Sequence, residues 1–173
     1  MDMGYLSVKN ATGDMKFEGK YPVNAVGDLN IPSLNKSLNI HDIKVVAKGS
    51  LDTIQAGVAT NTPDLLTGWV VLHPVRKHVP MFGELQFKEY HWPLITEQKL
   101  FTKNGVAKFN GDIDRLNIDV ATDLTGKNIP QGQYSGSMHT DLVHQLDINN
   151  LNGQLMSGAV NVAGVVGWKD HVN

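Results

Sequence analysis

The chain has 173 residues, a formal net charge of −2 at pH 7 and no cysteine. The weak negative charge argues against a nucleic-acid partner, because phosphate binding needs clustered Lys and Arg. The absence of cysteine fits an oxidising compartment such as the periplasm. No apolar run approaches the ~20 residues that a membrane-spanning helix needs, and residues 1–4 do not resemble a signal peptide.

The length suits one domain or part of a larger protein. The chain begins in strand-like sequence and ends at Trp168–Asn173 without a turn or a cap. We therefore expect residues 1–173 to form a single segment of a longer protein.

Period-two alternation of apolar and polar residues predicts β-strands, whose side chains point alternately to opposite faces. The cleanest alternation runs from Leu116 to Leu124. In chain order, alternating or apolar runs occupy 6–17, 21–31, 43–58, 69–72, 85–88, 116–124 and 146–168, with turns expected at 10–13, 32–36 and 60–64.

The run from Leu146 to Trp168 predicts a hairpin. Leu146 and Ile148 alternate with polar residues, a bend follows at 149–152, and Gly153 is expected to open the second strand. Asn and Gly tolerate the dihedral angles of tight turns, which favours a turn at this asparagine-rich stretch.

Prolines and glycines punctuate the remaining sequence. His73 to Pro80 (HPVRKHVP) is expected as a loop or a sheet edge. The glycines at 19, 49, 111 and 158 are expected at bends or bulges that curve the sheet. Only His139 to Leu146 is compatible with a helical turn or two, so the chain is predicted to be all-β with few or no helices.

An internal repeat supports a regular array. Gly49 to Thr60 aligns with Gly111 to Thr122, with matching glycine, aliphatic and polar positions. Such a repeat favours growth by strand addition, and about a dozen antiparallel-type strands at ~4.8 Å spacing would extend for ~50–60 Å.

A sheet with one apolar face must cover that face. From the residues alone two arrangements stay open: a closed sandwich, in which Ile118, Val120 and Val160 form an ordinary core, and a curled trough whose apolar interior meets another molecule. Base rates favour the closed core, whereas the aromatic content of only 7% favours an incompletely filled concave surface.

Catalytic and metal-binding patterns are weak, and we expect neither an enzyme nor a cofactor. The closest histidine pairs, His73 with His78 and His139 with His144, have i,i+5 spacing rather than the i,i+4 spacing of a helical zinc site. The acidic stretch 111–119 (GDIDRLNID) lacks the Glu-terminated loop of a calcium site, so it is interpreted as a solvated strand face. No G-x-S-x-G elbow or phosphate-binding glycine loop is present.

Four short motifs carry a family resemblance that covers nearly the whole chain at low identity. They are EYHWP at 89–93, GKNIP at 126–130, INNL at 148–151, and the closing run 153–168 with Gly158, Gly164 and Trp168. In their order and spacing they resemble the periplasmic repeat region of the TamB family, within the AsmA-like superfamily. The resemblance is to an internal segment between the N-terminal anchor and the C-terminal domain.

The resemblance implies an elongated, U-shaped β-groove (β-taco-like), open along one side and lined with aliphatic residues. It further implies a hydrophobic conduit for phospholipid between the inner and outer membranes, in a system linked through TamA to autotransporter and outer-membrane protein assembly. Such a protein lies in the periplasm, tethered by an inner-membrane anchor outside this chain, and meets TamA through a region outside it. The expected groove residues, which would contact acyl chains, are Val23, Ala25, Leu29, Val45, Ile54, Val58, Val70, Leu85, Phe87, Leu116, Ile118, Val120, Val160, Val162 and Val166.

Two other functions stay open. A chaperone-like scaffold would hold unfolded outer-membrane β-strands or an unfolded autotransporter in the groove or at a sheet edge. A closed β-sandwich would act as a structural spacer or bind carbohydrate through exposed aromatic residues, of which few are obvious. In the conduit and in the scaffold the sheet stays open, and its unpaired end strands are expected to associate edge to edge.

Overall fold

A computed structural model describes residues 7–16, 19, 21–30, 43–60, 65–92, 100–127, 129–141, 144–156 and 158–167. In this part of the chain every regular element is a β-strand, and none is a helix long and apolar enough to cross a membrane. The strands are β1 (Ser7–Met15), β2 (Pro22–Asn30), β3 (Ile43–Ser50), β4 (Thr53–Thr60), β5 (Leu65–Leu72), β6 (Met81–Trp92), β7 (Leu100–Gly111), β8 (Leu116–Gly126), β9 (Ile129–Thr140), β10 (Gln145–Leu155) and β11 (Gly158–Gly167).

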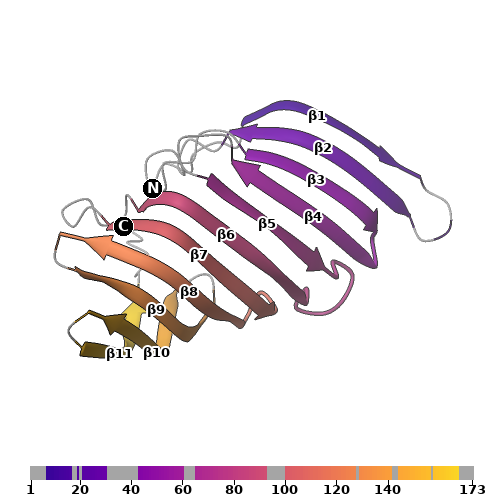
Figure 1. Cartoon of the computed structure of the whole chain (residues 1–173). Helices are drawn as coiled ribbons and strands as arrows, with labels where there is room; N and C mark the ends of the chain where they lie inside the picture. Colours follow the sequence, from indigo (N-terminus) through magenta and orange to yellow (C-terminus); the bar gives the residue numbers. More distant parts are fainter. Residues whose placement is uncertain are drawn as a thin grey trace, which may run out of the picture.

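The strands form one antiparallel sheet in which spatial order equals chain order, from β1 to β11 (Figure 1). Extensive contacts between described strands join only sheet neighbours. The described part is therefore a single layer that does not close on itself, and β9 to β11 turn out of the direction of the earlier strands (Figure 1). This confirms the open, curled all-β sheet, and the closed sandwich is not formed by the described strands.

The alternation of the strands gives the sheet two chemically different faces. In β3, Ile43, Val45 and Ala47 are half-buried, whereas Lys44 and Lys48 are exposed. The strand register carries this division from strand to strand. We call the side that holds Val45 the aliphatic face and the opposite side the polar face.

The glycines that were expected at bends or bulges lie at or beside the hairpin turns. The glycines with positive φ in the described residues are the four predicted positions: Gly19 (64°), Gly49 (147°), Gly111 (144°) and Gly158 (155°). A Cβ at Gly49 would overlap the carbonyl oxygen of Thr53, and one at Gly111 would overlap that of Arg115. Gly49 pairs with Ile54 and Gly111 with Leu116, so the aligned sequence repeats occupy equivalent places in two hairpins.

The predicted turns at 10–13 and 149–152 are wrong. Residues 10–13 lie within β1, and the chain turns only after Met15. The asparagine-rich stretch 149–152 is part of β10, where the register shifts between Ile148 and Leu151 as in a β-bulge. Gly153 consequently lies inside β10 rather than at the start of the second strand, which begins at Gly158.

The other connections follow local hydrogen bonding. His73 to Pro80 is a loop between β5 and β6, as expected, and the His73 N–H donates to the Pro80 carbonyl at 3.0 Å. The stretch from His139 to Leu146, which was compatible with a helical turn, contains the end of β9 and the start of β10. Between these strands Asp141 Oδ1 accepts from the backbone N–H groups of His144 (2.7 Å) and Gln145 (3.1 Å). The turn predicted at 32–36 lies outside the described residues, as do residues 61–64 of the turn predicted at 60–64.

Candidate functional site

The sheet register brings the expected groove residues onto one surface. Across the strands, Val45 pairs with Val58, Leu85 with Ala107, Ala107 with Val120, and Leu151 with Val162. Gly68 and Gly136 complete this row from β3 to β11. The aliphatic face also contains Val23, Ala25, Ile54, Val70, Phe87, Leu116, Ile118 and Val160 by the same pairing.

Two further expected groove residues are placed by backbone register only. Leu29 pairs with Ile43 in β3, and Val166 pairs with Leu146 in β10. Both positions therefore continue the rows of the aliphatic face. Trp168 lies outside the described residues, and the side chain of Trp92 is not described.

Burial on the aliphatic face is incomplete. The buried hydrophobic residues there are Tyr90, Leu100, Ala107, Leu116 and Tyr134. Most other positions are half-buried, and Val160 and Val162 of β11 are exposed. A closed core buries such side chains fully, so this face is a partly covered apolar surface.

Glycines on the aliphatic face are overlain by neighbouring side chains. A Cβ at Gly83 would lie 2.5 Å from Phe109 Cζ, and one at Gly153 would lie 2.5 Å from a ring carbon of Tyr134. The large side chains therefore lie across the backbone of adjacent strands. Glycine is therefore needed where such a ring crosses the neighbouring strand, because any larger residue would overlap it.

Hydroxyl groups on the aliphatic face bond within the protein. Thr60 Oγ1 accepts from the Leu66 N–H at 2.9 Å, Thr140 Oγ1 donates to the Gln145 carbonyl at 2.7 Å, and Tyr134 Oη donates to the Pro130 carbonyl at 2.8 Å. Because these polar atoms are occupied, the groups add little polarity to the surface.

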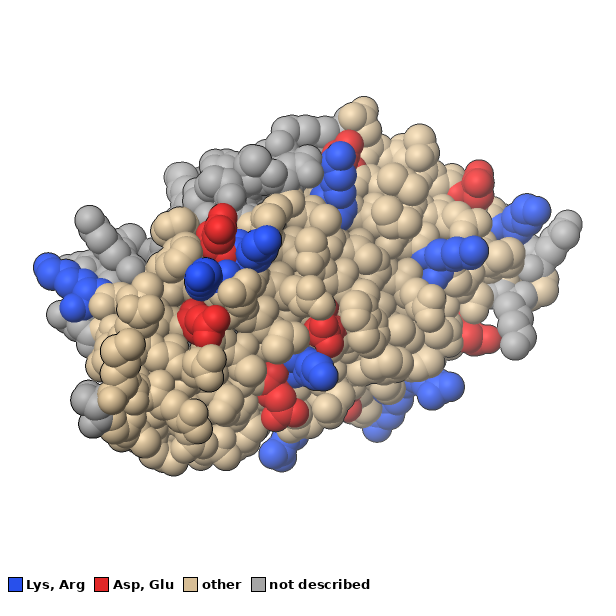
Figure 2. Space-filling view, in the orientation of Figure 1, with Lys and Arg blue, Asp and Glu red and all other residues tan. Residues whose placement is uncertain are grey.

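The two faces differ in charge. Among the paired strand positions with described side chains, the aliphatic face carries no Asp, Glu, Lys or Arg. The polar face carries a row of charged residues. In this row Lys108 pairs with Glu84 on one side and with Asp119 on the other. Figure 2 shows charges of both signs interspersed on the face toward the viewer, with no large patch of one sign.

One region of the aliphatic face departs from simple alternation. Glu89 has a left-handed φ of 53°, and Tyr90 beyond it is buried although Lys88 is exposed. Thr102, opposite Tyr90 on β7, is also buried, although Asn104 is exposed. Parity counting from the 85–88 run missed Tyr90, and Thr102 lies in β7, where no strand was expected. The signal for Tyr90 lay in the EYHWP stretch, where alternation between hydrophobic and polar residues breaks down.

The described histidines and acidic residues bond to one another or to the backbone in loops, in turns and between strands. His78 pairs with Asp114, which joins the β5–β6 loop to the β7–β8 turn, and His139 Nε2 lies 2.8 Å from Asp147 Oδ2. Asp112 Oδ1 accepts the backbone N–H groups of Asp114 and Arg115. No cluster of three metal-ligating side chains occurs within the part of the chain that the structure describes.

The fold and its surface place the described part of the chain among single-layer, amphipathic antiparallel sheets with one continuous, uncharged aliphatic face. A family model described as "TamB, N-terminal domain" matches residues 1–173. The chain belongs to the TamB family. The match agrees with the resemblance of the motifs to this family. No curated protein and no solved structure is significantly similar to the chain.

Proposed function

We propose that the aliphatic face is a segment of a hydrophobic conduit that carries phospholipid acyl chains between the inner and outer membranes. One observation carries the proposal: uncharged aliphatic rows continue from strand to strand across the sheet. Eleven strands at ~4.8 Å spacing give a surface about 48 Å long in the stacking direction. The groove residues named above would contact the acyl chains.

The energetics suit transport better than storage. Each acyl CH₂ moved from water to this surface contributes ~0.8 kcal/mol, so a long chain gains enough to remain associated. Val, Ile and Leu make no directional bonds, so moving from one strand to the next exchanges equivalent contacts. Head groups would remain in water at the open side.

Membership of the TamB family supports a role in a transport and assembly component rather than an enzyme. We further propose that the chain lies in the periplasm as part of a longer β-groove. Regions outside this chain would provide the inner-membrane anchor and the link to TamA and autotransporter assembly.

Site-specific photocrosslinking tests the conduit. A photoreactive residue is placed at Ile118 or at its neighbour Asn117, in cells that contain the complete protein. Ile118 is half-buried on the aliphatic face, whereas Asn117 is exposed on the polar face and donates to the Asn110 carbonyl at 3.3 Å. Phospholipid captured at 118 and not at 117 supports the conduit, and capture only of the protein's own residues contradicts it.

A second candidate function, holding unfolded β-strands, is favoured by the two ends of the sheet. In the described residues β1 pairs only with β2, and β11 only with β10. An end strand presents backbone N–H and C=O groups to an incoming strand. Unfolded polypeptide captured at 118 would support holding in the groove, and capture at Val165 of the end strand β11 would support holding at the sheet edge.

A further inference from the structure

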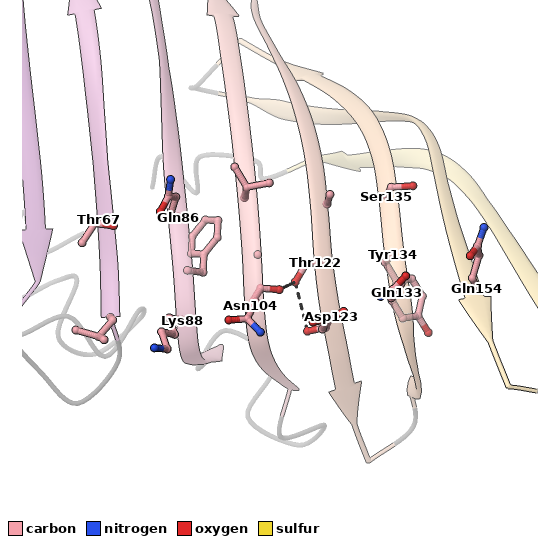
Figure 3. A pocket seen from close by; sticks show the side chains of 15 residues that line it. Thr67, Gln86, Lys88, Asn104, Thr122, Asp123, Gln133, Tyr134, Ser135 and Gln154 are labelled. Atoms are coloured by element: carbon pink, nitrogen blue, oxygen red, sulfur yellow. Dashed lines mark hydrogen bonds between the residues drawn. The ribbon is translucent and has the colours of Figure 1, made fainter.

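A hollow on the polar face is lined mainly by residues that the conduit does not use, and Phe87 of the aliphatic face also lines it. Its volume is about 700 Å³, and it extends from β5 to β10 (Figure 3). Most of the lining side chains belong to the polar face, including Thr67, Gln86, Asn104, Gln133 and Gln154. The sequence interpretation treated this face as merely solvated, so the hollow is a feature of the tertiary structure.

The register explains the shape of the hollow. Val106 pairs with Ala121, and Ala121 pairs with Ser135, so three small side chains form a floor across β7, β8 and β9. Longer side chains lie beside this floor. Lys88 of β6 pairs with Asn104 of β7. Gln133 of β9 pairs with Asp123 of β8 and with Gln154 of β10. The hollow is consequently a trough that crosses the strands.

The lining is rich in neutral hydrogen-bonding groups. The side chains of Asn104, Gln133, Ser135 and Gln154 form no hydrogen bond with any other residue that the structure describes. Their amide and hydroxyl groups are both donors and acceptors. The two charged side chains of the trough, Lys88 and Asp123, have opposite signs and give it no net charge.

An exposed aromatic residue lies beside one end of the trough. Trp69 follows Thr67 by two positions in β5 and shares its face, with 46% of its surface exposed. Its ring is held edge-on by Phe82, with the ring centroids 5.9 Å apart. A fixed, exposed indole offers a flat apolar platform next to the polar trough.

We propose that this trough binds an uncharged, linear glycan. Amide and hydroxyl side chains match the hydroxyl and acetamido groups of sugars, and the indole matches the apolar face of a pyranose ring. The neutral lining does not suit a polyanion, which needs clustered Lys and Arg. An acyl chain would leave the amides without partners, and an extended peptide binds sheet edges through its backbone rather than a sheet face.

Titration calorimetry with the purified chain tests the proposal, with chitohexaose and cellohexaose as neutral probes. Sulfated dextran and an unstructured peptide serve as comparison polymers. We expect saturable binding of at least one neutral glycan. Ser135→Leu fills the floor and is expected to weaken binding about tenfold. Trp69→Ala is expected to weaken the same binding, because it removes the platform.

The matched control is Asn24→Leu, an exposed substitution on the same face in β2, outside the trough. It is expected to leave binding unchanged, and thermal unfolding verifies that all variants fold. No saturable binding of either neutral glycan overturns the proposal. Binding that Ser135→Leu leaves unchanged also overturns it, as does stronger binding of the sulfated dextran or the peptide. Lipid capture at position 118 is a separate readout, so failure here leaves the conduit intact.

Discussion

Tyr90 and Thr102 lie opposite each other on β6 and β7, 2% and 0% exposed, although Lys88 and Asn104 on the same strands are exposed. Residues two positions apart in a regular strand share a face. The left-handed φ of Glu89 breaks this rule in β6, and the register between β7 and β8 shifts between Thr102 and Gly105. The paired irregularities bury Tyr90 beside Phe87, with ring centroids 5.8 Å apart.

This relationship predicts unequal effects of substitution at Glu89. Glu89→Val should destabilise the protein by about 1–2 kcal/mol, because a β-branched side chain opposes a left-handed backbone. Glu89→Gly should retain or raise stability, because glycine adopts this conformation freely. Urea unfolding measures both, with Gln86→Val as an exposed control in β6. Equal losses for Val and Gly would show that the backbone conformation is not the cause.

The glycines of the two faces should respond differently to a methyl group. A Cβ at Gly136 would overlap the Asn150 carbonyl and lie 2.8 Å from Leu151 Cα, both backbone atoms of β10. Gly136→Ala should therefore cost about 1–3 kcal/mol of unfolding free energy. At Gly57 the nearest atom is the Gly68 carbonyl oxygen at 3.9 Å, so Gly57→Ala should gain up to ~1 kcal/mol. Thermal and urea unfolding compare them, and a neutral Gly136→Ala would contradict the close strand packing.

Asp112 should stabilise the β7–β8 turn through hydrogen bonds rather than through its charge. Its Oδ1 accepts from the N–H groups of Asp114 at 2.9 Å and Arg115 at 3.0 Å. Asp112→Ala should cost about 1 kcal/mol, whereas Asp112→Asn, which keeps an acceptor oxygen, should cost much less. Urea midpoints of the two variants provide the measurement. Equal losses would assign the effect to charge.

Substitutions at two neighbouring valines test whether the aliphatic face, and not the polar face, carries acyl chains. Val45 is half-buried on the aliphatic face, whereas Val46 is 53% exposed on the polar face. Val45→Lys should lower phospholipid capture at position 118 about tenfold, because it places a charge in the acyl-chain path. Val46→Lys introduces the same side chain on the other face and should leave capture unchanged. Equivalent capture by the two variants would argue against transport along the aliphatic face.

The end strand β11 should mediate self-association. Val165 is 66% exposed on this edge strand. Val165→Lys should therefore reduce oligomers formed at high concentration, because a lysine on an edge strand opposes pairing with a second copy. Sedimentation velocity over a concentration series measures the effect. Val26→Lys, exposed but on the interior strand β2, is the control. A wild-type chain that stays monomeric throughout would contradict edge pairing.

Most strands and their aliphatic-face residues were predictable from local sequence, but no run was expected at β7 or β9, so these two strands were missed. Alternation identified residues such as Ile118 and Val120, because each occupies a regular strand in which parity alone selects the face. Gly49 and Gly111 were expected at bends or bulges, and both have positive φ, which glycine adopts without steric penalty. These features depend on neighbouring residues along the chain.

Features that depend on two strands at once were not predictable in this way. The stretch 149–152 had the composition of a turn, but its pairing with β9 and β11 makes it a bulge. Tyr90 and Thr102 had the parity of polar-face residues, and the irregularities in β6 and β7 bury them. The trough floored by Val106, Ala121 and Ser135 exists only because the register aligns small side chains from three strands. Sequence alone determined which side chains alternate, whereas tertiary structure decided register and curvature, because cross-strand hydrogen bonds join residues that are distant along the chain.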